Sequence, residues 1–128
     1  MILLLDTSTP ECRLAFIDGD WRYETKWEAG RELAKGLLAY IQSQLEGQGK
    51  TWKDLTGLGV FKGPGSFTGL RIGITVLNTV SYAEKIPIVG ETGDDWREKA
   101  IQRLLAGESD QVVLPEYGGE ANITLPRK

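Results

Sequence analysis

The chain has 128 residues, of which 41% are hydrophobic and 26% are charged, and its formal net charge is −3. These values are ordinary for one soluble globular domain. Its lysines and arginines form no cluster in the sequence, which argues against tight nucleic-acid binding by this chain alone. No apolar run reaches the roughly 18 residues of a membrane span, and the N-terminus lacks the features of a signal peptide, so we expect no membrane contact.

Two residue types limit the chemistry. Histidine is absent, and Cys12 is the only cysteine. A histidine general base, a histidine-dependent triad, a histidine-ligated metal and a cysteine-rich zinc site are therefore excluded for this sequence. We expect no metal and no cofactor. Because a lone cysteine cannot form an internal disulfide, we expect a reducing cytoplasm as the compartment.

The first half of the chain predicts three strands followed by a helix. Residues 2–6, ILLLD, form a continuous apolar run typical of a strand buried on both faces. Residues 12–17 predict a second strand, and Asp18-Gly19-Asp20 is a hairpin signal. Residues 21–27 alternate aromatic side chains or threonine with charged ones, as in a strand with one solvated face. Apolar residues at every fourth position predict a helix over residues 31–46.

The second half predicts two strands and two helices. Residues 51–54 have the spacing of a short capped turn, and residues 57–61, GLGVF, predict a central strand. Residues 66–84 are rich in β-branched side chains but are too long for a strand, so they predict a helix that is apolar nearly all round. A short strand over residues 87–89 and a helix over residues 94–106 follow.

This order of elements predicts an α/β fold. Antiparallel strands that lead into βα units imply a mixed five-stranded sheet with helices on its faces. The same order is found in the ribonuclease H-like lobe of actin-like ATPases. We therefore expect residues 1–108 to form a single lobe of this kind and residues 109–128 to form an extended C-terminal tail.

A glycine-rich stretch, FKGPGSFTGLRIGITVL, covers residues 61–77 and raises the question of catalysis. A Walker A loop requires a lysine after its last glycine, and none follows Gly69. A dinucleotide-binding fingerprint is one residue shorter than the spacing found here. A nucleophile elbow requires glycines where Pro64 and Thr68 stand. The stretch therefore matches none of these three chemical motifs.

What remains is a strand-to-helix turn. Ser66 or Thr68 can accept hydrogen bonds from the first N–H groups of the helix. Gly69 and Gly73 lie four residues apart on one helix face, where the lack of side chains lets another backbone approach closely. We interpret the turn as a capped packing helix. The alternative that its free N–H groups attract an anion stays open.

A second candidate lies at the end of the first predicted strand. Asp6 stands where an actin-like ATPase holds a carboxylate near nucleotide-bound magnesium. Capping of a turn by aspartate, serine and threonine side chains explains the same residues equally well. The candidate anion or nucleotide contacts are Asp6, Thr7, Ser8 and Ser66.

Two segments together resemble the TsaB family, also called YeaZ. They are the N-terminal ILLLDTSTPECRLAF and the run GPGSFTGLRIGI, in the same order and context as in that family, and the resemblance covers roughly residues 1–90. The resemblance implies an actin-like fold and a non-catalytic role. It implies support of TsaD, which transfers threonylcarbamoyl to adenosine 37 of tRNA, together with the ATPase TsaE.

The sequence departs from this family in two places. Family members usually carry a histidine where this chain has Gly30-Arg31-Glu32. They also generally have a second lobe, whereas here LPEYGGEANIT, residues 114–124, follows soon after the last predicted helix and resembles the family's C-terminal ending. We therefore expect a form that lacks most of the second lobe. Such a form would lose one wall of the interlobe cleft and would not hydrolyse ATP independently.

The resemblance also implies a partner surface on the two helices over residues 31–46 and 67–84. Our leading hypothesis is a non-catalytic subunit that binds a TsaD-like partner there. One alternative is a degenerate actin-like phosphotransferase that uses Asp6. The other is a stand-alone homodimer that pairs the same helix face with itself. The predicted interface residues are Leu33, Leu37, Ile41, Gly69, Gly73, Val76 and Val80.

Overall fold

The computed structural model describes residues 1–116, and its elements follow the predicted order. Every helix and strand begins and ends within two residues of the predicted positions. Short 3-10 turns precede α1 and β4, and the second of them closes the capping box predicted for residues 51–54. The elements are β1 (Ile2–Asp6), β2 (Glu11–Asp18), β3 (Trp21–Glu28), α1 (Leu33–Gly47), β4 (Gly57–Phe61), α2 (Phe67–Glu84), β5 (Ile88–Glu91) and α3 (Trp96–Leu105).

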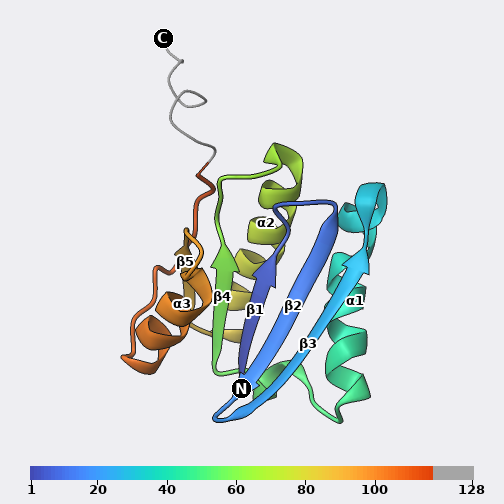
Figure 1. Ribbon diagram of the computed structural model, residues 1–128. Coiled ribbons are helices and arrows are strands. Elements are labelled where there is room, and N and C mark those ends of the chain that lie inside the picture. Colours follow the sequence, from blue (N-terminus) through green and yellow to red (C-terminus); the bar gives the residue numbers. More distant parts are fainter. Residues whose placement is uncertain (117–128) are drawn as a thin grey trace.

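The strands form one mixed five-stranded sheet in the order β3-β2-β1-β4-β5, as expected of an α/β fold of this kind (Figure 1). β1 pairs antiparallel with β2, and β2 with β3, whereas β1–β4 and β4–β5 are parallel pairs. Asp18 lies opposite Trp21, which leaves Gly19 and Asp20 as the predicted hairpin turn. Gly19 adopts φ 62°, a value that glycine tolerates best.

Helices cover both faces of the sheet. α1 and α2 lie on one face, and α3 lies on the other, against β4 and β5 (Figure 1). Side chains of a strand alternate between faces, so the apolar run of β1 serves both cores, with Leu3 and Leu5 toward the helix pair and Leu4 toward α3. The continuous apolar pattern of residues 2–6 therefore reflects burial on both faces, as predicted.

The helix α2 is more amphipathic than the sequence suggested. Ser66 caps it, with its hydroxyl accepting a hydrogen bond from the Gly69 N–H at 3.3 Å. Lys85 ends it in the left-handed conformation, with φ 57°. The side facing the sheet is buried, but a stripe of threonines with one arginine faces outward, so the helix is not apolar all round. The outward stripe consists of Thr68, Arg71, Thr75 and Thr79.

Candidate functional sites at the strand ends and on the helix pair

The turn after β1 is fastened to the glycine-rich turn before α2. The Ser8 N–H donates to Asp6 Oδ1 at 2.8 Å, so the aspartate caps its own turn. The Ser66 N–H donates to the Ser8 carbonyl, also at 2.8 Å. Thr7 points inward, is fully buried, and donates its hydroxyl to the Gly69 carbonyl at 2.7 Å.

The glycines of α2 make room for this turn. A Cβ atom on Gly73 would overlap Thr7 Oγ1 and would lie 3.0 Å from Thr7 Cγ2. A Cβ atom on Gly69 would overlap the Thr7 carbonyl oxygen, and one on Gly65 would lie 2.5 Å from Ser8 Cβ. The close approach predicted for Gly69 and Gly73 is therefore present, but the neighbour is the chain's own backbone and Thr7.

Most of the predicted interface residues belong to the core of this chain. Leu33, Leu37, Ile41 and Val80 are at most 6% exposed and pack in the layer between the helices and the sheet. With the two glycines of α2 they form the inner face of the helix pair, because their four-residue spacing matches the side that covers the sheet. Only Val76 of the predicted residues is partly exposed. Their burial leaves most of these side chains little area for direct contact with a partner, and the interface with its residues stays a prediction.

The outer surface of the helix pair carries a shallow groove between α1 and α2. Its volume is about 350 Å³. Leu38 of α1 and Phe67 of α2 are large exposed apolar side chains on the same two helices, 51% and 52% exposed. The Arg71 guanidinium lies over the Phe67 ring, 5.4 Å from its centroid. The groove is lined by Ala34, Thr68, Arg71, Ile72, Thr75 and Val76.

A second hollow continues this groove toward the start of both helices. It has a volume of about 320 Å³, and it shares Thr68 and Ile72 with the first. Ser66 lines this hollow, and Asp6 does not.

Of the predicted interface residues, Val76 lines the groove, and Leu33 and Gly69 line the second hollow. Sequence reasoning missed the other lining residues because it selected the strongest apolar period. One sequence signal could have indicated the outer surface of α1. Small or apolar residues directly follow two of its core positions, with Ala34 after Leu33 and Leu38 after Leu37.

Asp6 and Ser8 line a different pocket at the carboxyl ends of β1 and β4. This pocket has a volume of about 430 Å³ and also contains Asp94, which sequence reasoning missed although it follows β5 closely. The carboxyl ends of parallel strands are a common place for ligands in α/β folds. None of its lining residues is cationic, so a phosphate here would face two carboxylates. The other lining residues are Phe61, Pro64, Gly93 and Trp96.

The four predicted nucleotide contacts lie in two turns that hydrogen bonds join, but they do not line one common pocket. Asp6 and Ser8 share the pocket at the strand ends, Thr7 is buried against α2, and Ser66 lines the helix-pair hollow. Within residues 1–116, no group of three or more acidic or cysteine side chains is arranged to hold a metal ion. Over the same residues, no helix is long and apolar enough to cross a membrane.

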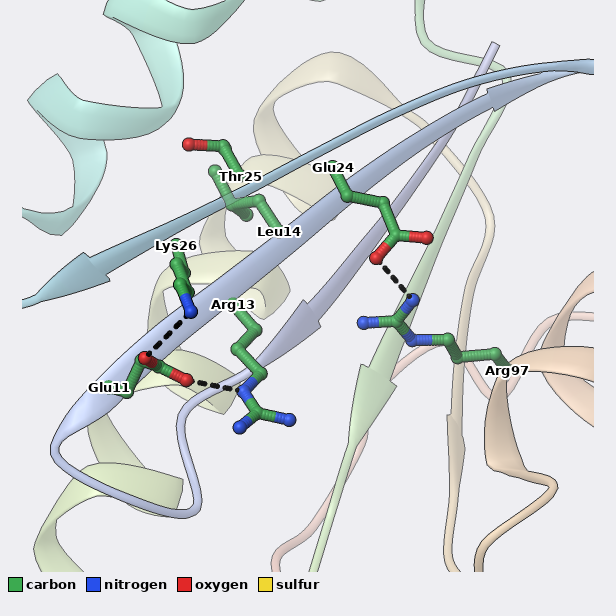
Figure 2. A pocket seen from close by; sticks show the side chains of 7 residues that line it. All are labelled: Glu11, Arg13, Leu14, Glu24, Thr25, Lys26 and Arg97. Carbon is green, nitrogen blue, oxygen red and sulfur yellow. Dashed lines mark hydrogen bonds and ion pairs between the residues drawn. The ribbon is translucent and has the colours of Figure 1, made fainter.

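A charged hollow lies on the β2 and β3 strands, near α3 (Figure 2). Arg13 Nε contacts Glu11 Oε1 at 2.7 Å, and Lys26 contacts the other oxygen at 3.8 Å. Arg97 of α3 contacts Glu24 at 3.3 Å. The hydrogen bond from Arg13 holds the pKa of Glu11 below its usual value. Each carboxylate is thus paired within the chain, and the lining carries one more cationic side chain than carboxylates.

The comparisons with known families agree with the fold described above. The model of the family described as TsaD, tRNA N6-adenosine threonylcarbamoyltransferase, matches residues 27–92, which is more than half of the chain. Among solved structures, YeaZ from Pseudomonas aeruginosa has a TM-score of 0.67 and 27% sequence identity, and the likeness covers 77% of this chain and 49% of that one. The actin-like, ribonuclease H-like fold predicted from the element order is therefore confirmed.

The curated relatives are named tRNA threonylcarbamoyladenosine biosynthesis protein TsaB. The Escherichia coli protein is 30% identical over 94% of this chain and 56% of its own length. The protein from Buchnera aphidicola subsp. Schizaphis graminum is 36% identical over 91% of this chain and 60% of its own length. The Bacillus subtilis protein is 50% identical over 68% of this chain and 38% of its own length. The matched regions thus span between 38% and 60% of the length of these relatives, and the chain belongs to the TsaB (YeaZ) family, within the wider group that the TsaD model describes.

Proposed function

We propose that this chain is a non-catalytic subunit that binds a TsaD-like protein in the synthesis of threonylcarbamoyladenosine at position 37 of tRNA, in the cytoplasm. The observation that carries the proposal is the groove on the outer surface of α1 and α2, with Leu38 and Phe67 exposed beside it. The names of the TsaB relatives support the pathway. The partner would contact the outer residues of the helix pair rather than the buried leucines.

The groove has the composition of a protein-binding surface. Its floor is apolar, with Ile72 and Val76, and its rim carries Arg71 and threonine hydroxyls. Protein interfaces commonly combine an apolar centre with a polar rim. A helix of the partner would fill the groove with apolar side chains and would cover Leu38. The buried glycines of α2 act indirectly, because they let the helix lie close to β1 and so fix the depth of the groove.

Isothermal titration calorimetry with a purified bacterial TsaD protein tests the proposal. Leu38→Arg and Val76→Arg should each weaken binding by about 30-fold or more, since a central interface residue is commonly worth about 2 kcal/mol. Leu105→Arg is the matched control, because Leu105 is a large apolar residue, 76% exposed, on α3 across the sheet. Undiminished affinity in both helix-pair variants, with folding intact by circular dichroism, would rule out this surface.

A phosphotransferase is the second candidate, and one observation favours it. Asp6 and Asp94 line one pocket at the carboxyl ends of parallel strands, where a nucleotide-bound metal ion could neutralise both carboxylates. We expect no ATP turnover by the purified chain. Turnover that disappears in the Asp6→Ala variant would favour this candidate over the non-catalytic subunit.

The same helix surface offers two further partners. Without TsaD, two copies could pair through the groove, and Leu38→Arg should then reduce self-association measured by analytical ultracentrifugation. A TsaE-like ATPase would join only the complex with TsaD, which size-exclusion chromatography of the mixture would detect. With a net charge of −3, the chain alone should show no tight binding to tRNA in a fluorescence anisotropy titration.

A further inference from the structure

The outer edge of β5 carries four backbone groups that no strand pairs. On its inner edge β5 pairs with β4, where the Leu58 N–H donates to the Pro87 carbonyl and the Lys62 N–H to a carbonyl at the end of β5. Successive residues of a strand direct their backbone groups to alternate sides. The N–H and C=O groups of Ile88 and Gly90 therefore point away from β4, at the end of the described sheet.

All four groups have partners in α3 and in the segment that follows it. The Ile88 N–H donates to Ser109 Oγ at 3.2 Å, and the Ile88 carbonyl accepts from the Asp110 N–H at 2.7 Å. The Gly90 N–H donates to Asp110 Oδ2 at 2.9 Å, and the Gly90 carbonyl accepts from Arg103 Nη1 at 3.3 Å. Only one of these partners is a backbone group. The edge is thus satisfied without a sixth strand.

The segment continues as a strap, residues 109–116, between β5 and the flank of α2. Val113 is only 3% exposed, and its N–H and C=O each form a 2.9 Å hydrogen bond with the side-chain amide of Asn78. Gly90 leaves space for it, since a Cβ atom there would lie 2.5 Å from Val113 Cγ1. The Glu116 N–H donates to the first carbonyl after β4 at 2.7 Å. The strap is therefore held at its start, middle and end.

Ion pairs with Arg103 of α3 hold the start of the strap in place. Arg103 contacts Asp110 at 2.5 Å, Glu108 at 2.8 Å and Glu91 at 3.0 Å, and Lys62 adds a more distant attraction for Asp110. Burial disfavours the ionised form of Asp110, but the hydrogen bonds from Arg103 and from a β5 backbone N–H outweigh it and hold its pKa below the usual value. Asp110 is therefore ionised at neutral pH and tied to both α3 and β5.

The outer edge of β5, which the strap covers, is complementary to the same edge of a second copy. In an antiparallel pair of two copies, Ile88 of each copy could lie opposite Gly90 of the other, and each opposed pair would exchange two hydrogen bonds. An uncovered edge of this kind is a template for pairing with another chain. We propose that the strap, residues 109–116, ends the sheet at β5 and blocks pairing of two copies of this chain through that edge. Because the strap covers the edge mostly with side chains, it presents no equivalent ladder of its own.

Hydrogen exchange and sedimentation of strap variants of the full chain test this proposal. Asp110→Ala removes the partner of the Gly90 N–H, and Asn78→Ala removes the clamp on Val113. In dilute, monomeric protein, Asp110→Ala should speed exchange of the Gly90 amide by about tenfold or more, as expected for loss of a charge-assisted hydrogen bond, and Asn78→Ala should speed exchange of the Val113 amide. At higher protein concentration both variants should self-associate more than the wild type. Glu108→Ala is the matched control, because it removes an Arg103 ion pair without touching the edge.

Two results would overturn the proposal. One is unchanged Gly90 exchange in folded Asp110→Ala protein. The other is faster exchange with sedimentation identical to the wild type. If Asp110→Ala unfolds, Ser109→Ala replaces it and should speed exchange of the Ile88 amide, together with that of Gln111, whose N–H donates to the same hydroxyl. Adding Leu38→Arg to the strap variant distinguishes the surfaces, since edge pairing survives it and helix-pair association does not.

Discussion

Replacing Gly73 by alanine adds one methyl group where α2 meets the turn after β1. The new Cβ atom would overlap Thr7 Oγ1 and lie 3.0 Å from Thr7 Cγ2. Thr7 cannot yield easily, because it is fully buried and its hydroxyl is bonded to the Gly69 carbonyl at 2.7 Å. Either the helix moves away from the sheet or Thr7 changes rotamer, and both movements pull the Thr7 hydroxyl away from the Gly69 carbonyl.

The net effect follows from three opposing contributions. Alanine gains about 1 kcal/mol over glycine in a helix interior. Overpacking a filled site costs about 1–3 kcal/mol, and loss of the buried hydrogen bond costs a further 1–3 kcal/mol by order of magnitude. We therefore expect Gly73→Ala to lower the free energy of unfolding by about 1–5 kcal/mol, with 3 kcal/mol as the rough centre of that range.

Urea unfolding followed by tryptophan fluorescence measures this change. Gly47→Ala is the matched control, since Gly47 is also helical but a Cβ atom there would meet nothing within 4 Å. It should be neutral or slightly stabilising. In a Thr7→Ala background, which removes Oγ1 and Cγ2, Gly73→Ala should cost at least about 1 kcal/mol less than in the wild type.

The opposite outcome would refute the packing argument. If Gly73→Ala stabilises the chain as much as Gly47→Ala does, α2 does not press against Thr7. If the cost is the same with and without Thr7→Ala, some contact other than Thr7 opposes the methyl group. In the first of these two cases Gly73 would be free to take part in the predicted partner interface.

Two further predictions concern titratable groups. Asp110 has a lowered pKa in the folded chain, so its ionised form contributes stability that is present above the usual aspartate pKa of about 4 and is lost as the pH falls below it. The difference in unfolding free energy between wild type and Asp110→Asn should therefore shrink as the pH falls from about 6 to about 3, and a constant difference would contradict this. Cys12 is 1% exposed, and burial, with a smaller effect of Asp6, raises its pKa to about 12. It should not react with a thiol reagent at pH 8 until urea unfolds the chain, and rapid labelling of the native protein would contradict its burial.

The sequence by itself determined the elements and their order. Three local patterns show this: the run ILLLD, the hairpin signal Asp18-Gly19-Asp20 and the four-residue period of α1. Such patterns indicate which residues of a strand or helix are buried in the core. The length of residues 66–84 decided correctly between strand and helix, although β-branched residues pointed the other way. The two motifs shared with the TsaB family carried the functional expectation.

Only the tertiary structure decided which way each face points. Periodicity places Gly69 and Gly73 on one helix face but does not say whether that face meets a partner or the chain's own Thr7, because the answer depends on a turn about 60 residues away. The same holds for the core leucines of α1, which the sequence placed in an interface. The only local signal of the strap on β5 is its apolar run Val112-Val113-Leu114, which predicts that the segment docks but does not say where. Its side-chain partners come from α3 and α2, and long-range packing alone brings them to the outer edge of β5, one of the two edges of the described sheet.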